Sequence, residues 1–259
     1  MGEQVVKSER KDRTLVLTVD FPPSNALAPA VRDALSAALA AAAADEEIWT
    51  VIITATGEKF FMAGANIPSL LELDPPAALA RVEAAHAFMQ ALCDLPKPTI
   101  AAINGYCLGG GLELALCCDI RIAAEHARLG LPETALGLMP GGGGTQRLPA
   151  IVGQGFARHL IFSAGQLTAA EALGMGLVQK MVPSGRLKAE ALALAATINR
   201  QGPLGVRAAK QALNAAYNMP LDQALATERR LWADLFASQD LKEGLGAFLA
   251  KREPDFRAC

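Results

Sequence analysis

Short apolar segments rich in β-branched residues alternate with helical patterns through roughly the first 180 residues of the chain. Residues 29–44 and 75–92 have helical patterns, whereas residues 49–55, 99–103 and 119–123 are typical of strands. Strands and helices that alternate in this way usually form a sheet with helices packed on its faces. The alternation therefore predicts an α/β fold for this part of the chain.

The pattern changes beyond Pro183, where every predicted element is a helix. These predicted helices comprise residues 187–199, 203–217, 221–237 and 241–250. A run of helices after an α/β region predicts an all-helical extension. We therefore predict a catalytic core, residues 1–195, and a helical C-terminal region, residues 196–259.

Composition and charge argue against several classes of protein. Of the 259 residues, 52% are hydrophobic and 19% are charged, which is typical of a globular protein with a sizeable core. The net charge of −2 and the lack of a polybasic stretch argue against nucleic-acid and membrane partners.

The first 20 residues carry many charges and lack the apolar run of a signal peptide, so we expect a cytoplasmic location. Five cysteines without a CxxC motif and three scattered histidines predict no metal site.

Two glutamates twenty residues apart are the main candidates for catalysis. Glu113 ends a segment, residues 104–113, that contains three consecutive glycines, and Glu133 precedes a second glycine-rich segment, residues 139–146. Paired carboxylates can share proton transfer, and N–H groups flanked by glycine can stabilise an oxygen that becomes negative. The combination predicts chemistry on a carbonyl compound that passes through an enolate.

The three glycines Gly109–Gly111 are predicted to begin a helix that carries Glu113 about one turn later. The first N–H groups of a helix have no intrahelical partner, and the helix dipole adds partial positive charge at the same end. A thioester or ester oxygen docked there would be polarised. Residues 64–67 provide a second candidate donor, and two donors form a better oxyanion hole than one.

Each of these segments also has a purely structural interpretation. The glycines before Glu113 could form only a tight turn, and Glu133 could be an acidic residue that interacts with a helix dipole. Residues 141–144 could be a bare loop or a phosphate cradle, and Asn66 could be an ordinary helix cap. The occurrence of these segments together and in this order favours the functional interpretation.

Other catalytic motifs are absent from the sequence. It contains no GxxxxGK[ST] phosphate-binding loop and no GxSxG nucleophile elbow. His86 and His159 fall in helical patterns, which indicates surface or packing roles rather than a catalytic base.

Together these segments resemble the crotonase, or enoyl-CoA hydratase/isomerase, superfamily, and most of all its enoyl-CoA hydratases. The resemblance extends from about Thr14 to Phe256. It rests on residues 61–67, 103–115, 118–123, 131–133, 140–148 and 243–256.

The resemblance implies a spiral of ββα units followed by helices that form homotrimers, which often pair into homohexamers. It implies an acyl-CoA substrate and no separate cofactor, because coenzyme A is part of the substrate. The backbone N–H groups of Ala65 and Gly110 would hold the thioester oxygen. Glu113 would act as the base toward water adding at C3, Glu133 would handle the proton delivered to C2, and Gly141 would position Glu133 or the water.

The same resemblance implies contacts to the CoA part of the substrate from Asn25, Ala26, Leu27, Lys59, Ala63, Ala65, Asn66, Ile67, Phe248 and Lys251. Phe248 and Lys251 would reach the CoA bound to a neighbouring subunit, and the lysines of this set could equally be solvated surface charges. The chain departs from the commonest pattern at Asn66, where Asp is usual, and at Pro68, where Lys is frequent. The mostly apolar residues 67–73 favour a plain alkyl enoyl chain.

The resulting hypothesis is the reversible addition of water to a trans-2-enoyl-CoA, giving a 3-hydroxyacyl-CoA, as in fatty acid metabolism. The presence of both glutamates favours a hydratase, because relatives that isomerise, hydrolyse or decarboxylate usually lack one of them. The alternatives are an enoyl-CoA isomerase, a specialised hydratase such as a methylglutaconyl-CoA hydratase, and a non-catalytic acyl-CoA-binding trimer.

Overall fold

The computed structural model describes residues 4–63 and 67–259. In this part of the chain the strands are β1 (Val6–Lys11), β2 (Thr14–Val19), β3 (Thr50–Ala55), β4 (Phe60–Met62), β5 (Thr99–Ile103), β6 (Tyr106–Leu108), β7 (Ile120–Ala124), β8 (Arg128–Gly130), β9 (Leu167–Thr168) and β10 (Lys180–Val182). The α-helices are α1 (Pro29–Ala44), α2 (Ile67–Leu71), α3 (Pro75–Cys93), α4 (Gly110–Cys117), α5 (Gly144–Val152), α6 (Gln154–Phe162), α7 (Ala169–Gly174), α8 (Leu187–Asn199), α9 (Pro203–Asn218), α10 (Leu221–Asp234) and α11 (Gln239–Ala250). The short 3-10 helices are η1 (Pro132–Leu136), η2 (Ser184–Arg186) and η3 (Leu235–Ala237).

The strands form two sheets, between which the chain passes repeatedly. The larger sheet has the order β1-β2-β3-β5-β7-β10 and is parallel except for the β1–β2 hairpin. The smaller sheet has the order β4-β6-β8-β9 and is antiparallel only between β8 and β9. The pairs β3/β4, β5/β6 and β7/β8 therefore each place one strand in each sheet before the chain continues into helices. This repeated ββα unit confirms the predicted α/β spiral.

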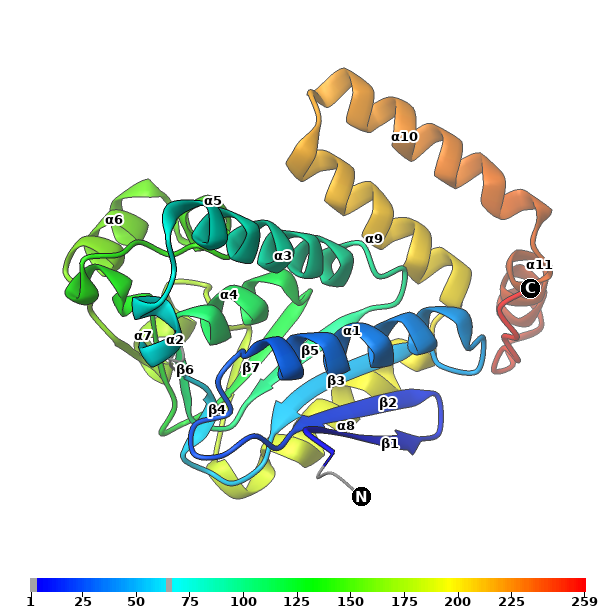
Figure 1. The fold of residues 1–259 in the computed structure, drawn as a ribbon. Coiled ribbons are helices and arrows are strands. Elements are labelled where there is room, and N and C mark those ends of the chain that lie inside the picture. Colours follow the sequence, from blue (N-terminus) through cyan, green and yellow to red (C-terminus); the bar gives the residue numbers. More distant parts are fainter. Residues whose placement is uncertain (1–3, 64–66) are drawn as a thin grey trace.

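Successive side chains of the larger sheet face two separate apolar layers. In β3, Val51 and Ile53 belong to the layer that contains Leu35 of α1 and Met89 of α3. Ile52 points to the opposite layer, which is covered by α8 (Figure 1). Because both faces are covered, the central strands are apolar along their whole length, and this made them recognisable in the sequence.

The predicted elements with a long periodic pattern are observed with nearly the same bounds. The predicted helix 75–92 corresponds to α3, and the predicted helix 187–199 has the bounds of α8. Residues 221–237 form α10 and then η3. The helix α8 packs on the larger sheet from Leu187 to Ile198 and ends at Asn199, past the domain boundary predicted between residues 195 and 196.

The last three helices lead away from the sheets. Figure 1 shows α9 and α10 as an antiparallel pair, with α11 near the start of α9. The Lys210 ammonium of α9 donates to the Asp119 carboxylate at 2.8 Å and to the Lys97 carbonyl at 3.0 Å, which fastens α9 to the core. Large apolar side chains are exposed on these helices and on η3: Leu213, Tyr217, Leu221, Trp232, Phe236, Leu245, Phe248 and Leu249. None of the helices in residues 4–63 and 67–259 is long and apolar enough to cross a membrane.

Candidate active site

The predicted helix that carries Glu113 is α4. One glycine forms the turn into this helix, and another lets it pack closely against β4. Gly109, the residue before the helix, has φ = 58°, in the left-handed region that favours glycine. Gly111 packs so tightly that a Cβ there would lie 2.1 Å from the carbonyl oxygen of Met62, the last residue of β4. The N-terminus of α4 therefore lies directly against the end of β4.

Two backbone amides hold the Glu113 carboxylate. Glu113 is only 4% exposed, and its Oε1 accepts hydrogen bonds from the N–H of Gly142 at 2.7 Å and of Gly144 at 2.8 Å. A Cβ on Gly142 would lie 2.5 Å from Glu113 Oε2, and one on Gly144 would lie 2.8 Å from Leu131 Cδ1. The glycine-rich segment is therefore neither a bare loop nor a phosphate cradle, because its amides bind a carboxylate of the chain itself.

Glu133 lies at the start of η1, soon after β8. Its Oε1 is close to Gly109, where a Cβ would be 3.0 Å away. Its Oε2 is buried and has no hydrogen-bond partner in the described part of the chain. Burial, followed by the negative charge of Glu113, raises the pKa of Glu133 to about 7. A carboxyl group with such a pKa can accept or deliver a proton at neutral pH.

The two carboxyl groups therefore have different electrostatic surroundings. Burial also raises the pKa of Glu113, but the two backbone N–H groups oppose this rise, as do the positive charges of Arg147 and His86. These groups favour the ionised form of Glu113, whereas the pKa of Glu133 is lowered by a hydrogen bond from its own backbone N–H and raised by the charge of Glu113. The arrangement suits a base at Glu113 and a proton carrier at Glu133.

Part of the predicted oxyanion hole falls within the described residues. Gly110 is the first residue of α4, so its N–H has no acceptor within the helix. A Cβ on Gly110 would meet the Leu27 side chain at 3.7 Å, which places the loop before α1 beside this N–H. Ala65, the other predicted donor, and Asn66, a predicted CoA contact, lie outside the described residues.

The predicted CoA contacts of the N-terminal half lie around the same end of α4. Ala26 and Leu27 are half-buried just before α1, and Ala63 is buried directly after β4. Asn25 is buried, and its side chain accepts from the Phe21 N–H at 2.9 Å and donates to the Phe60 carbonyl at 3.1 Å. The Asn25 side chain thus links the loop before α1 to β4.

The predicted contacts Lys59, Ile67, Phe248 and Lys251 lie at other positions. Lys59 is exposed just before β4, with its ammonium 5.2 Å from the centre of the Phe60 ring, and Ile67 is the first residue of α2. Phe248 is 82% exposed on α11, and Lys251 follows that helix. Figure 1 shows α11 far from α4, so Phe248 and Lys251 are remote from the two glutamates of their own chain.

Two charged side chains near the glutamates were missed as part of the site by the sequence analysis. His86 of α3 donates from Nε2 to the carbonyl of Gly141 at 2.7 Å, and Arg147 of α5 donates to the carbonyl of Gly142 at 3.2 Å. The ring of His86 is exposed, so the predicted surface location is right but incomplete. Arg147 lies within the quoted segment 140–148 but had no role assigned there, and no local motif marks His86, which contacts this segment from α3.

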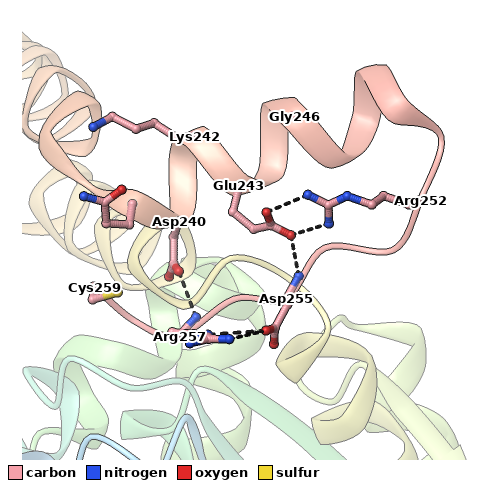
Figure 2. Close-up of a pocket in the computed structure, with 9 residues that line it drawn as sticks. Asp240, Lys242, Glu243, Gly246, Arg252, Asp255, Arg257 and Cys259 are labelled. Atoms are coloured by element: carbon pink, nitrogen blue, oxygen red, sulfur yellow. Dashed lines mark hydrogen bonds and ion pairs between the residues drawn. The ribbon is translucent and has the colours of Figure 1, made fainter.

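A pocket lies at the C-terminus, and its contacts indicate a structural role. Figure 2 shows this pocket of about 430 Å³ between α11 and the C-terminal tail. Arg252 donates to both oxygens of Glu243, and Arg257 donates to Asp255 at 2.9 Å. Buried Asp240 accepts from two backbone N–H groups of the tail. These charges are satisfied by one another and fasten the tail to α11.

Across the described residues, no three His, Cys, Asp or Glu side chains form a group that could hold a metal ion.

The fold and the site together define a spiral α/β protein with paired carboxyl groups at a helix N-terminus. The family model described as enoyl-CoA hydratase/isomerase matches residues 9–258. The chain is 43% identical to the 2,3-dehydroadipyl-CoA hydratase of Escherichia coli (strain K12) and 40% identical to the crotonyl-CoA hydratase of Syntrophomonas wolfei, with 99% of each chain covered in both comparisons. The crystal structure of an enoyl-CoA hydratase from Bacillus anthracis, 36% identical, matches with a TM-score of 0.94 over 98% of this chain and 100% of that one. The chain therefore belongs to the enoyl-CoA hydratase/isomerase family.

Proposed function

We propose that the protein is a hydro-lyase that adds water reversibly to a trans-2-enoyl-CoA and gives a 3-hydroxyacyl-CoA. The observation that carries this proposal is the difference between the two glutamates. Glu113 is held by two amides that favour its ionised form, and Glu133 has a pKa of about 7 and a buried oxygen without a partner among the described residues. Hydration requires one proton to be removed from water and one to be delivered to carbon, and the pair provides both functions.

In this mechanism a water molecule is held between the two carboxyl groups. Glu113 removes a proton as the water oxygen forms a bond to C3, and the C2–C3 π electrons move toward the thioester carbonyl. The N–H of Gly110, with a second donor at Ala65, stabilises the enolate oxygen. Glu133 then delivers a proton to C2, and the net change is the addition of one water molecule. Positioned carboxyl groups also remove most of the entropic cost of bringing water to the double bond.

The helical C-terminal region suits the trimer that the sequence resemblance implies. Exposed apolar side chains on α9, α10 and α11 supply a surface that association of subunits would bury. Phe248 and Lys251, remote from their own glutamates, are available to the CoA of a neighbouring subunit. Light scattering after size-exclusion chromatography is expected to give the mass of three or six chains of 27.1 kDa.

The decisive experiment follows the loss of the conjugated thioester absorbance of crotonyl-CoA and then of longer, branched and ω-carboxylated enoyl-CoAs. Rapid loss that requires both Glu113 and Glu133 would establish the hydratase and rank its substrates. Rapid conversion of 3-enoyl-CoA to 2-enoyl-CoA by a variant lacking one glutamate, with no hydration by the wild type, would identify an isomerase. CoA binding without turnover of any of these thioesters would instead support the non-catalytic alternative.

A further inference from the structure

The hydrogen bond between His86 and Gly141 lies one peptide group away from Glu113. His86 Nε2 is 2.7 Å from the carbonyl oxygen of Gly141. A carbonyl can only accept, so Nε2 carries the hydrogen of this bond. The same peptide group has its N–H on Gly142, and this N–H donates to Glu113 Oε1 at 2.7 Å. One peptide group therefore connects the imidazole to the carboxylate in an unbroken chain of hydrogen bonds.

The second amide that holds Glu113 has an equivalent support, but from the backbone. The Gly144 N–H donates to Glu113, and the carbonyl of the same peptide group belongs to Gly143. That carbonyl accepts from the backbone N–H groups of Gln146 at 3.0 Å and Arg147 at 2.9 Å, in the first turn of α5. The helix therefore supports one peptide group whatever its side chains are, whereas the other depends on the side chain of His86.

The contacts around this segment restrict how it can move. Val82 lies one turn before His86 on α3. Its side chain would be 3.5 Å from a Cβ added to Gly141. The Arg147 guanidinium donates to the Gly142 carbonyl and lies over Gly143, whose added Cβ would collide with it. A glycine-rich segment has more conformational freedom than any other, so its orientation depends on such external contacts.

We propose that His86 is a positioning residue, which orients and polarises the Gly141–Gly142 peptide group so that its N–H holds the Glu113 carboxylate. A donor on the carbonyl makes the N–H of the same peptide group a stronger donor, because hydrogen bonds in a chain polarise one another. A stronger N–H donor favours the ionised carboxylate and keeps the free oxygen of Glu113 aimed at the reacting water. This inference rests on the proposed function only in assigning Glu113 as the base.

The charged groups that act on Glu113 besides His86 are Arg147 and the neighbouring Glu133. Arg147 contributes a positive charge, and the pKa of Glu133 is about 7. Substitution of His86 leaves both groups in place. A change in the titration of Glu113 in a His86 variant can therefore be assigned to the lost hydrogen bond or the lost imidazole charge.

The test compares His86→Leu, which removes the donor, with His86→Gln, whose amide nitrogen can occupy the place of Nε2. The histidine His159, exposed on α6, provides a matched control as His159→Leu. The full-length oligomer is titrated by carbon NMR of labelled glutamate carboxyl groups, with the Glu113 signal assigned by Glu113→Gln. The pH profile of crotonyl-CoA hydration is measured in parallel.

In His86→Leu we expect the midpoint of the Glu113 titration to rise by about half a pH unit, because the lost hydrogen bond acts on the carboxylate through one peptide group. The midpoint of the acid limb of the pH–activity profile should move to higher pH by a similar amount. We expect kcat to fall several-fold and KM to change little. The Glu113 titration and the activity of His86→Gln should lie closer to those of the wild type, and those of His159→Leu should match the wild type.

Equal effects of His86→Leu and His86→Gln, or an unshifted Glu113 titration in both variants, would overturn the proposal. The NMR titration does not require turnover, so a wild type without hydratase activity would contradict the proposed function and leave this test decisive.

Discussion

The surroundings of Glu113 and Glu133 differ in how many elements hold each carboxyl group. Glu113 lies on a helix, is almost completely buried, and receives two amide donors, from Gly142 before α5 and from Gly144 at its start. Glu133 lies on a five-residue 3-10 helix, is half-buried, and has one oxygen without a partner in the described residues. Oε1 of Glu113 thus accepts two hydrogen bonds, whereas Oε2 of Glu133 is buried without a partner among the described residues. A buried polar group left unpaired in this way costs stability, so it indicates a role other than stabilising the fold.

The comparison shows how one fold gives two identical side chains different chemistry. Burial raises the pKa of both. At Glu113 two backbone amides and the charges of Arg147 and His86 oppose this rise, whereas at Glu133 the residue's own backbone N–H opposes it and the charge of Glu113 adds to it. Groups that interact this closely titrate as a pair, and the protein biases which member of the pair keeps the proton. Four experiments test this difference.

The largest expected effect is on turnover when either carboxyl group becomes an amide. Glu113→Gln and Glu133→Gln should each reduce kcat by about 10² to 10⁴, because each removes a positioned acid or base. Crotonyl-CoA hydration measures this loss, and circular dichroism should show an unchanged fold, since Gln has the shape of Glu. Near-native rates in a double variant would remove both residues from the mechanism.

The next effect concerns the contact between Gly142 and Glu113. Gly142→Ala adds a Cβ that would lie 2.5 Å from Glu113 Oε2, so the carboxylate must move. A displacement of about 1 Å at a reacting group can cost about 10² in rate, and we expect a loss of this size in kcat.

The matched control for that substitution is Gly155→Ala. Gly155 lies in α6, and a Cβ there would have no neighbour within 4 Å. Alanine favours the helix over glycine, so this variant should keep full activity and equal or higher stability. If both alanine variants are fully active, Glu113 does not depend on close packing against its amides.

The third prediction concerns stability and pH at Glu133. Its pKa in the folded protein, about 7, lies above its ordinary value of 4.5, so the folded state binds the proton more tightly than the unfolded state. Stability from this group is therefore present below pH 4.5 and is lost as the pH rises from 4.5 to about 7. Allowing for partial solvent exposure, we expect a loss of about 1 kcal/mol.

Thermal or urea unfolding between pH 5 and pH 8, on the wild type and on Glu133→Gln, measures this contribution. The difference in unfolding free energy between the two proteins should grow with pH in favour of the glutamine variant, because glutamine has no proton to lose. A constant difference across the range would mean that Glu133 has an ordinary pKa.

The smallest effect is expected where η1 is anchored. The Thr134 hydroxyl donates to the Ile161 carbonyl of α6 at 2.6 Å, next to Glu133 in the chain. Thr134→Val keeps the shape and removes the donor, so stability should fall by about 1 kcal/mol and kcat should fall several-fold. Thr134→Ser keeps the hydroxyl, so it should retain more of the stability and more of kcat than Thr134→Val. An unchanged kcat in Thr134→Val would show that η1 positions Glu133 without this hydrogen bond.

The outcome of the sequence predictions depended on the length of each pattern. The helices α3 and α8 and the strands β3 and β5 have long or strongly apolar patterns, and they were predicted almost residue by residue. The strands β6 and β9, of three and two residues, were not predicted, because so few residues show no periodicity. The smaller sheet, which consists of such short strands, became evident only from the pairing of distant segments.

The sequence by itself determined the α/β class, the helical C-terminal region, and the two glutamates set beside glycines. These features are local, since they depend on the order of residue types over short stretches. Only the tertiary structure decided that Gly142 and Gly144 hold Glu113 and that His86 and Arg147 support the segment between them. The amides come from 29 and 31 residues away in the chain, and no short pattern records that distance. The pKa of Glu133 depends on burial and on a neighbouring charge, so it exists only once the chain has folded around it.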